Sequence, residues 1–75
     1  MNPQPPRARV AIVEDDPILR EDVAQMVARA EGLEIAGVAD ALASGRTLLE
    51  PGLDVLLIDL ALPDGNGVEL IREAR

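Results

Sequence analysis

The segment Val55-Leu56-Leu57-Ile58-Asp59 is the strongest indication of the fold in this 75-residue sequence. Four apolar residues followed by a carboxylate, with Pro63 and Gly65-Asn66-Gly67 soon after, predict a fully buried strand that ends at an acid. In an open α/β sheet, ligands and reacting groups collect at the carboxyl ends of the strands. Asp59 is therefore the first candidate for a chemical role.

A strand and a helix are predicted near the start of the chain. Residues 10–13 form a short apolar run that ends at Glu14-Asp15-Asp16, which is typical of a buried parallel strand. Asp16 is expected to cap a helix that begins at Pro17 and stops at Gly32. The spacing predicts an apolar helix face made of Leu19, Val23, Met26, Val27 and Ala30.

The pattern then repeats twice. Residues 33–39 predict an outer strand, Asp40 is expected to cap a helix over residues 41–50, and Pro51-Gly52 stops that helix. After the strand at residues 55–59, Asn66-Gly67-Val68-Glu69 resembles a capping box that opens a third helix. Alternating strands and helices predict an α/β fold with a doubly wound parallel sheet. Residues 1–8, which contain three prolines, are expected to be a flexible lead-in.

Composition limits the possible functions. The formal charge of −7 argues against direct contact with nucleic acid or an anionic membrane. All seven cationic residues are Arg, so a lysine Schiff base and histidine acid/base catalysis are excluded within this sequence. The absence of Cys is compatible with a reducing cytoplasm, and no apolar run is long enough to span a bilayer. We therefore expect a cytoplasmic protein without membrane contact.

Three acids are expected to converge if the strands at residues 10–13 and 55–59 are neighbours. Glu14, Asp15 and Asp59 would then share one edge of the sheet, where like charges oppose each other's ionisation unless a cation offsets them. Mg²⁺ suits such a site because it prefers oxygen ligands and keeps positions open for a phosphoryl group. A carboxylate beside the ion can attack phosphorus and hold the phosphoryl group.

Each acid also has a purely structural interpretation. Asp16 fits a helix cap better than a metal ligand, and Glu14 and Asp15 are compatible with the solvated start of a loop. Asp59 alone is compatible with a turn residue. Asp64, between Pro63 and Gly65, is most simply a turn former, and no catalytic role is assigned to it.

Two motifs carry a resemblance to a known family. The run Val10-Ala11-Ile12-Val13-Glu14-Asp15-Asp16-Pro17 and the run from Leu57 through Asp59, Pro63 and Gly67 to Leu70 closely resemble the receiver domain of two-component response regulators. The resemblance covers residues 9–75 and implies a flavodoxin-like receiver. It implies that Asp59 is the phosphoacceptor. It also implies that Asp15 is a direct Mg²⁺ ligand, that Glu14 holds the ion chiefly through water, and that Ala61 lends its backbone carbonyl to the metal.

The sequence covers only the first three strand–helix units of such a domain. Family receivers have five strands in the order 2-1-3-4-5, with a Ser or Thr ending the fourth and a Lys ending the fifth. This sequence stops inside the third helix, so both residues are missing from it and a truncated receiver is expected. Residues 55–58 are then expected to form an unpaired edge that favours self-association.

The resemblance implies a phosphoacceptor rather than an enzyme. Asp59 would take a phosphoryl group from a sensor histidine kinase with Mg²⁺ and switch an output domain, typically in transcription regulation. A catalytically inert receiver fragment, acting as an interaction or dimerisation module, is the alternative.

The sequence disfavours three other types of site. A phosphatase of the haloacid dehalogenase type is disfavoured because Ala61 stands where that family has a second Asp. A dinucleotide site lacks its third Gly, since Leu70 occupies that position. The pattern of an EF-hand is also not met.

Overall fold

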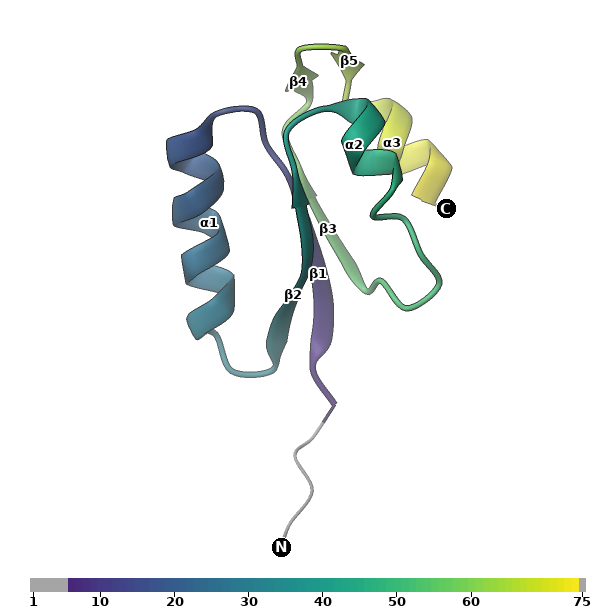
Figure 1. Ribbon diagram of the computed structural model, residues 1–75. Coiled ribbons are helices and arrows are strands. Elements are labelled where there is room, and N and C mark those ends of the chain that lie inside the picture. The colour runs from purple at the N-terminus through teal and green to yellow at the C-terminus, as the bar shows by residue number, and fades with distance from the viewer. Residues whose placement is uncertain (1–5, 75) are drawn as a thin grey trace, which may run out of the picture.

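A three-stranded parallel sheet is the centre of the fold. The computed structural model describes residues 6–74, and its strands lie in the order β2-β1-β3. One helix, α1, covers one face of the sheet, whereas α2 and α3 lie on the other (Figure 1). The predicted α/β class with a doubly wound parallel sheet is confirmed. The elements are β1 (Ala8–Val13), α1 (Pro17–Arg29), β2 (Leu33–Ala39), α2 (Leu42–Arg46), β3 (Val55–Ile58), β4 (Ala61–Leu62), β5 (Gly65–Asn66) and α3 (Val68–Ala74).

Strand β1 is the buried centre of the sheet. Its last four residues are almost fully covered, as the apolar run predicts for a strand with neighbours on both sides. β1 begins at Ala8, two residues before the expected start, because the Ala8 amide donates to the carbonyl of Gly32 at 2.8 Å. Ala8 therefore belongs to the sheet, and residues 1–5 of the expected lead-in lie outside the described part of the chain.

The sheet register confirms that the first and third strands are neighbours. Val10 pairs with Val55 and Val13 pairs with Ile58, so β1 and β3 end side by side. β2 is the outer strand on the opposite side of β1, also as expected. Its register shifts once, between the partners of Val10 and Ala11.

The two faces of the sheet have separate apolar clusters. Val10 and Ile12 point toward α1, where they pack with Val27. Val13, on the other face, packs with Leu42 of α2 and Leu70 of α3. Successive side chains of β1 point to opposite faces of the sheet, so this one strand contributes to both clusters.

The expectation that β3 is fully buried is wrong for one of its faces. Val55 and Leu57 are 37% and 40% exposed, whereas Leu56 and Ile58 pack against the cluster under α2 and α3. Val55 and Leu57 share the face of Val10 and Ile12, but α1 packs mainly over β2 and β1. Val55 and Leu57, on the α1 side of the edge strand β3, therefore remain partly uncovered.

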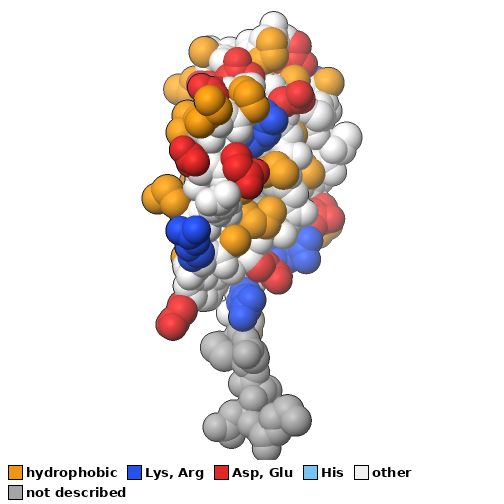
Figure 2. Space-filling model, turned by 60° about the vertical axis from the view of Figure 1, so that its left-hand side comes forward, with side chains coloured by type: hydrophobic (Ala, Val, Ile, Leu, Met, Phe, Trp, Pro, Cys, Tyr) orange, Lys and Arg blue, Asp and Glu red, His pale blue; other side chains and the backbone are white. Residues whose placement is uncertain are grey.

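Helix α1 starts as predicted. The Asp16 side chain accepts hydrogen bonds from the amides of Ile18 at 2.9 Å and Leu19 at 3.3 Å, with Pro17 in the first turn. Part of the predicted apolar face is not buried, since Leu19 is 49% and Met26 is 70% exposed. Figure 2, which turns the α1 side forward, shows apolar side chains among acidic and basic ones on this surface.

Helix α2 is shorter than the predicted residues 41–50. It ends at Arg46, after which Leu48 and Leu49 donate to the carbonyls of Gly45 and Arg46 in tight i to i+3 turns. These turns direct Leu48 and Leu49 toward the cluster beneath α2 without continuing the helix.

The predicted cap of α2 is also wrong. The Asp40 carboxylate accepts a hydrogen bond from the Ser44 hydroxyl, and the α2 amides are instead bound by Asp64.

The segment between β3 and α3 forms a hairpin that the sequence did not predict. β4 and β5 pair antiparallel, Ala61 with Asn66 and Leu62 with Gly65, and the predicted turn at Asp64 is their connection. The predicted capping box of α3 is half formed. The Asn66 side chain accepts from the Val68 amide at 2.9 Å, whereas the Glu69 carboxylate lies 3.8 Å from Arg46. No helix in residues 6–74 is long and apolar enough to cross a membrane.

Candidate functional site

Three carboxylates meet at the carboxyl end of the sheet. Glu14 and Asp15 follow β1, Asp59 follows β3, and one oxygen from each lies within 4.8 Å of the others. The predicted convergence of these residues is therefore confirmed. It follows from the parallel pairing of β1 with β3, which brings both strand ends to the same edge.

Backbone hydrogen bonds fix the chain at both strand ends. The Glu14 amide donates to the carbonyl of Ala39, and the Asp59 amide donates to the carbonyl of Val13, each at 3.0 Å. The Arg20 guanidinium donates to the Glu14 carbonyl at 2.9 Å. Arg20 therefore connects α1 to the backbone of Glu14, a contact that the sequence analysis missed because helical spacing places Arg20 off the apolar face.

Glu14 is the buried member of the cluster. Its surface is only 8% exposed. Burial raises the pKa of the Glu14 carboxyl above its ordinary value, and hydrogen bonding and charge from Asp59 raise that pKa further. The ionised form of Glu14 is therefore less stable at this position than that of a solvent-exposed glutamate.

The pKa of Asp59 is shifted in the opposite direction, below its ordinary value. The backbone N–H of Ala61 donates to its Oδ1 at 3.0 Å, and this bond is the largest cause that lowers the pKa of Asp59. Contact with the Glu14 side chain lowers the Asp59 pKa as well. The two acids therefore differ in role, with Asp59 favoured as the ionised partner.

The loop after Asp59 requires a glycine at position 67. Gly67 is buried, and its amide donates to the Leu60 carbonyl at 2.9 Å. A Cβ on Gly67 would collide with the backbone oxygen of Asp59 and press on the Ile58 side chain. The absence of a side chain thus lets the start of α3 close against the backbone of Asp59.

The cluster fits a hard divalent cation. It offers carboxylate oxygens from Glu14, Asp15 and Asp59, and these are the oxygens that Mg²⁺ prefers. Glu14 is buried among like charges, an arrangement that a cation would stabilise.

An apolar cavity of about 330 Å³ adjoins the acids. Glu14 and Asp59 are among the residues that line it, and Leu19, Val23 and Leu57 contribute apolar side chains to the lining. The exposed faces of α1 and β3 noted above therefore border the acidic cluster.

Two other acids named in the sequence analysis have structural contacts. Asp16 caps α1, and Asp64 binds backbone amides of α2. No local sequence pattern predicts the Asp64 contact, because its partners lie 21 and 22 residues away along the chain.

The chain is thus a doubly wound α/β protein with acids at the carboxyl ends of two adjacent strands, where ligands bind in this class of fold. The family model described as "Response regulator receiver domain" matches residues 10–75. This chain therefore belongs to the response regulator receiver domain family of two-component systems, in which phosphorylation and Mg²⁺ binding are general features.

Several curated proteins are similar to this chain. It is 36% identical to transcriptional regulatory protein MalR of Bacillus subtilis over 88% of the chain, and 41% identical to transcriptional regulatory protein CitB of Klebsiella pneumoniae over 84%. It is 38% identical to protein-glutamate methylesterase/protein-glutamine glutaminase 5 of Myxococcus xanthus over 85%. These matches cover 28%, 27% and 19% of the three relatives, so the chain spans less than a third of their length. No solved structure gives a significant match.

Proposed function

We propose that Asp59 accepts a phosphoryl group from the phosphohistidine of a sensor histidine kinase and thereby switches an output domain. The observation that carries this proposal is the convergence of Glu14, Asp15 and Asp59 at the ends of β1 and β3 in a chain of the receiver family. Two of the relatives are named transcriptional regulatory proteins, which favours an output in transcription.

The chemistry assigned to Asp59 is a phosphoryl transfer. A carboxylate oxygen of Asp59 forms a bond to phosphorus as the bond from phosphorus to the donor imidazole nitrogen breaks, and that nitrogen keeps the electron pair. Glu14, Asp15, Asp59 and the Ala61 carbonyl are the groups that would hold Mg²⁺, which would neutralise charge around the phosphoryl oxygens. The bond from the Ala61 amide fixes the orientation of the attacking carboxylate. The product adds about −1.5 to −2 charge at this edge of the sheet.

Replacing Asp15 by alanine is expected to remove most Mg²⁺ binding. Asp15 is the exposed carboxylate of the cluster, and a direct ligand should matter at least as much as supporting residues, whose loss weakens metal affinity about 10- to 100-fold. Calorimetric titration with MgCl₂ measures the change. Asp22→Ala is the matched control, because it removes one exposed carboxylate on α1 outside the cluster. Equal Mg²⁺ affinity in the Asp15→Ala and Asp22→Ala proteins would contradict the assignment.

Self-association through β3 is a second function that the structure favours. The outer edge of β3 has no partner strand within residues 6–74, and Val55 and Leu57 are partly exposed beside it. Unpaired edges of this kind favour pairing with another strand, here β3 of a second copy. This role is compatible with the phosphoacceptor role and also with an inert module.

Sedimentation velocity at increasing protein concentration tests self-association. We expect a dimer that Leu57→Lys disrupts by placing a charge on the exposed face of β3. Met26→Lys adds the same charge on exposed α1 surface and should leave the dimer intact. A protein that stays monomeric throughout, or a dimer insensitive to Leu57→Lys, would exclude β3 as the interface.

A further inference from the structure

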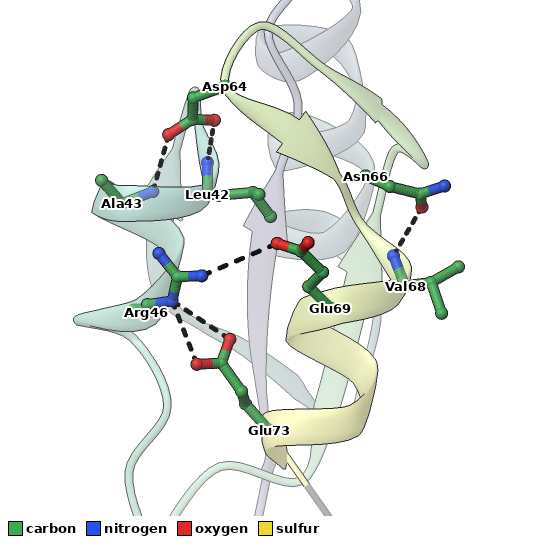
Figure 3. A network of polar contacts seen from close by, with 8 residues as sticks. All are labelled: Leu42, Ala43, Arg46, Asp64, Asn66, Val68, Glu69 and Glu73. Atoms are coloured by element: carbon green, nitrogen blue, oxygen red, sulfur yellow. Dashed lines mark hydrogen bonds and ion pairs between the residues drawn. The ribbon is translucent and has the colours of Figure 1, made fainter.

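The Asp64 carboxylate connects the β4–β5 hairpin to helix α2. Its Oδ1 accepts from the Leu42 amide at 2.7 Å and its Oδ2 accepts from the Ala43 amide at 3.0 Å (Figure 3). Both oxygens thus serve one pair of free helix amides, as a capping side chain does within its own helix. The cap of α2 comes from the tip of a hairpin that lies far away in sequence.

The base of the same hairpin contacts Asp59, the candidate phosphoacceptor. Ala61, the first residue of β4, donates its amide to the Asp59 side chain at 3.0 Å. The Gly67 amide, just beyond β5, donates to the Leu60 carbonyl. Leu62 of β4 is buried in the cluster that also contains Leu42. The tip and the base of this short hairpin are therefore parts of one packed unit.

Helix α2 is itself held by its neighbour. Arg46 donates through Nε to both carboxylate oxygens of Glu73 at 3.1 Å, and its terminal nitrogen lies 3.8 Å from Glu69, both in α3 (Figure 3). Asn66 at the end of β5 in turn caps α3 at Val68. The contacts of Asp64, Arg46 and Asn66 thus close a ring from the hairpin through α2 and α3 back to the hairpin.

We propose that Asp64 is a positioning residue that holds the Ala61 peptide in place against Asp59 by anchoring the hairpin tip to α2. The consequence for phosphoryl uptake rests on the proposed function of Asp59, whereas the effect on Ala61 does not. The Ala61 peptide has two roles at the site. Its amide donates to the Asp59 side chain, and its carbonyl is one of the proposed metal ligands. Freeing the tip widens the positions open to this peptide and so misaligns both groups.

A simple turn residue would not make these contacts. A turn-forming Asp usually bonds to its own neighbouring backbone, but Asp64 binds two amides of another element. These two bonds are also the largest causes that lower the pKa of Asp64, so its ionised form is the one that holds α2. Arg46, one turn into α2, adds a smaller favourable charge.

Amide hydrogen exchange in the Asp64→Ala protein is the direct test. Losing a cap typically weakens local structure enough to speed amide exchange about tenfold, and we expect this at Leu42, Ala43 and also Ala61. Asp64→Asn keeps one oxygen acceptor and should recover part of the protection. Phosphoryl uptake from acetyl phosphate with Mg²⁺, followed by intact mass, should slow about tenfold in Asp64→Ala.

Asp54→Ala is the matched control. The Asp54 carboxylate also binds a backbone amide, that of Arg9 at 2.8 Å, but it lies before β3, at the opposite end from Asp59. The Asp54→Ala protein should lose stability, but its amide exchange at Ala61 should not become faster and its phosphoryl uptake should not become slower.

The outcomes separate the two proposals. Exchange at Ala61 that is unchanged in Asp64→Ala, or equally raised in Asp54→Ala, would overturn the positioning role of Asp64. Absence of uptake by the unsubstituted protein would overturn the proposed function of Asp59 instead, and the exchange at Ala61 would still decide the role of Asp64. Faster exchange at Ala61 with unchanged uptake would show that Asp64 does not position the reacting groups, and would also overturn the inference.

Discussion

The Asp59→Asn protein is expected to gain no phosphoryl group under conditions in which the unsubstituted protein gains one. An amide nitrogen and a neutral amide oxygen are poor nucleophiles toward phosphorus, while the shape of the side chain and the acceptor for the Ala61 amide are kept. The fold should therefore persist and only the chemistry should disappear. Intact mass after incubation with acetyl phosphate and Mg²⁺ measures the result.

The control for this experiment is another acid near the site. Asp16→Asn changes the cap of α1 and keeps an acceptor for its amides, so it should leave phosphoryl uptake unchanged. If the Asp59→Asn protein gains the same mass as the Asp16→Asn protein, Asp59 is not the acceptor.

Replacing Leu70 by alanine is expected to destabilise the fold by about 2–5 kcal/mol. Leu70 is fully buried in the cluster with Val13 and Leu42, and its Cδ1 lies only 2.8 Å from where a Cβ on Gly45 would be. Removing its side chain leaves a cavity that links α3, α2 and β1. In a small domain with few kcal/mol of stability, this loss unfolds much of the population at room temperature.

Urea denaturation followed by circular dichroism measures the change. Ile71→Ala, at the next position of α3, is the control because Ile71 is 38% exposed and should lose much less stability. Equal losses for the two substitutions would show that α3 does not pack on the sheet through Leu70.

The parts of this protein that depend on local pattern were predictable. The apolar run of β1 and the stretch from Val55 to Asp59 specified two parallel strands, and their pairing alone brings Glu14, Asp15 and Asp59 together. Asp16 and Pro17 specified the start of α1 for the same reason, since a cap involves residues within one turn.

The parts that depend on distant contacts were not predictable. Asp64 and Asp40 both suit a helix cap by type, and only the tertiary placement of the hairpin gives α2 to Asp64. The length of α2 was overestimated because an apolar spacing that suits a helix also suits the tight turns that seat Leu48 and Leu49. The exposed face of β3 depends on which elements cover Leu57, and hydropathy cannot show that.

The Mg²⁺ dependence of phosphoryl uptake by the unsubstituted protein shows whether Glu14, Asp15 and Asp59 form one Mg²⁺ site at which Asp59 reacts. Intact mass is measured after incubation with acetyl phosphate, once with MgCl₂ and once with a chelator. We predict a gain of one phosphoryl group with MgCl₂ and none with the chelator. No gain in either sample, or an equal gain in both, would contradict a Mg²⁺-dependent phosphoacceptor role for Asp59.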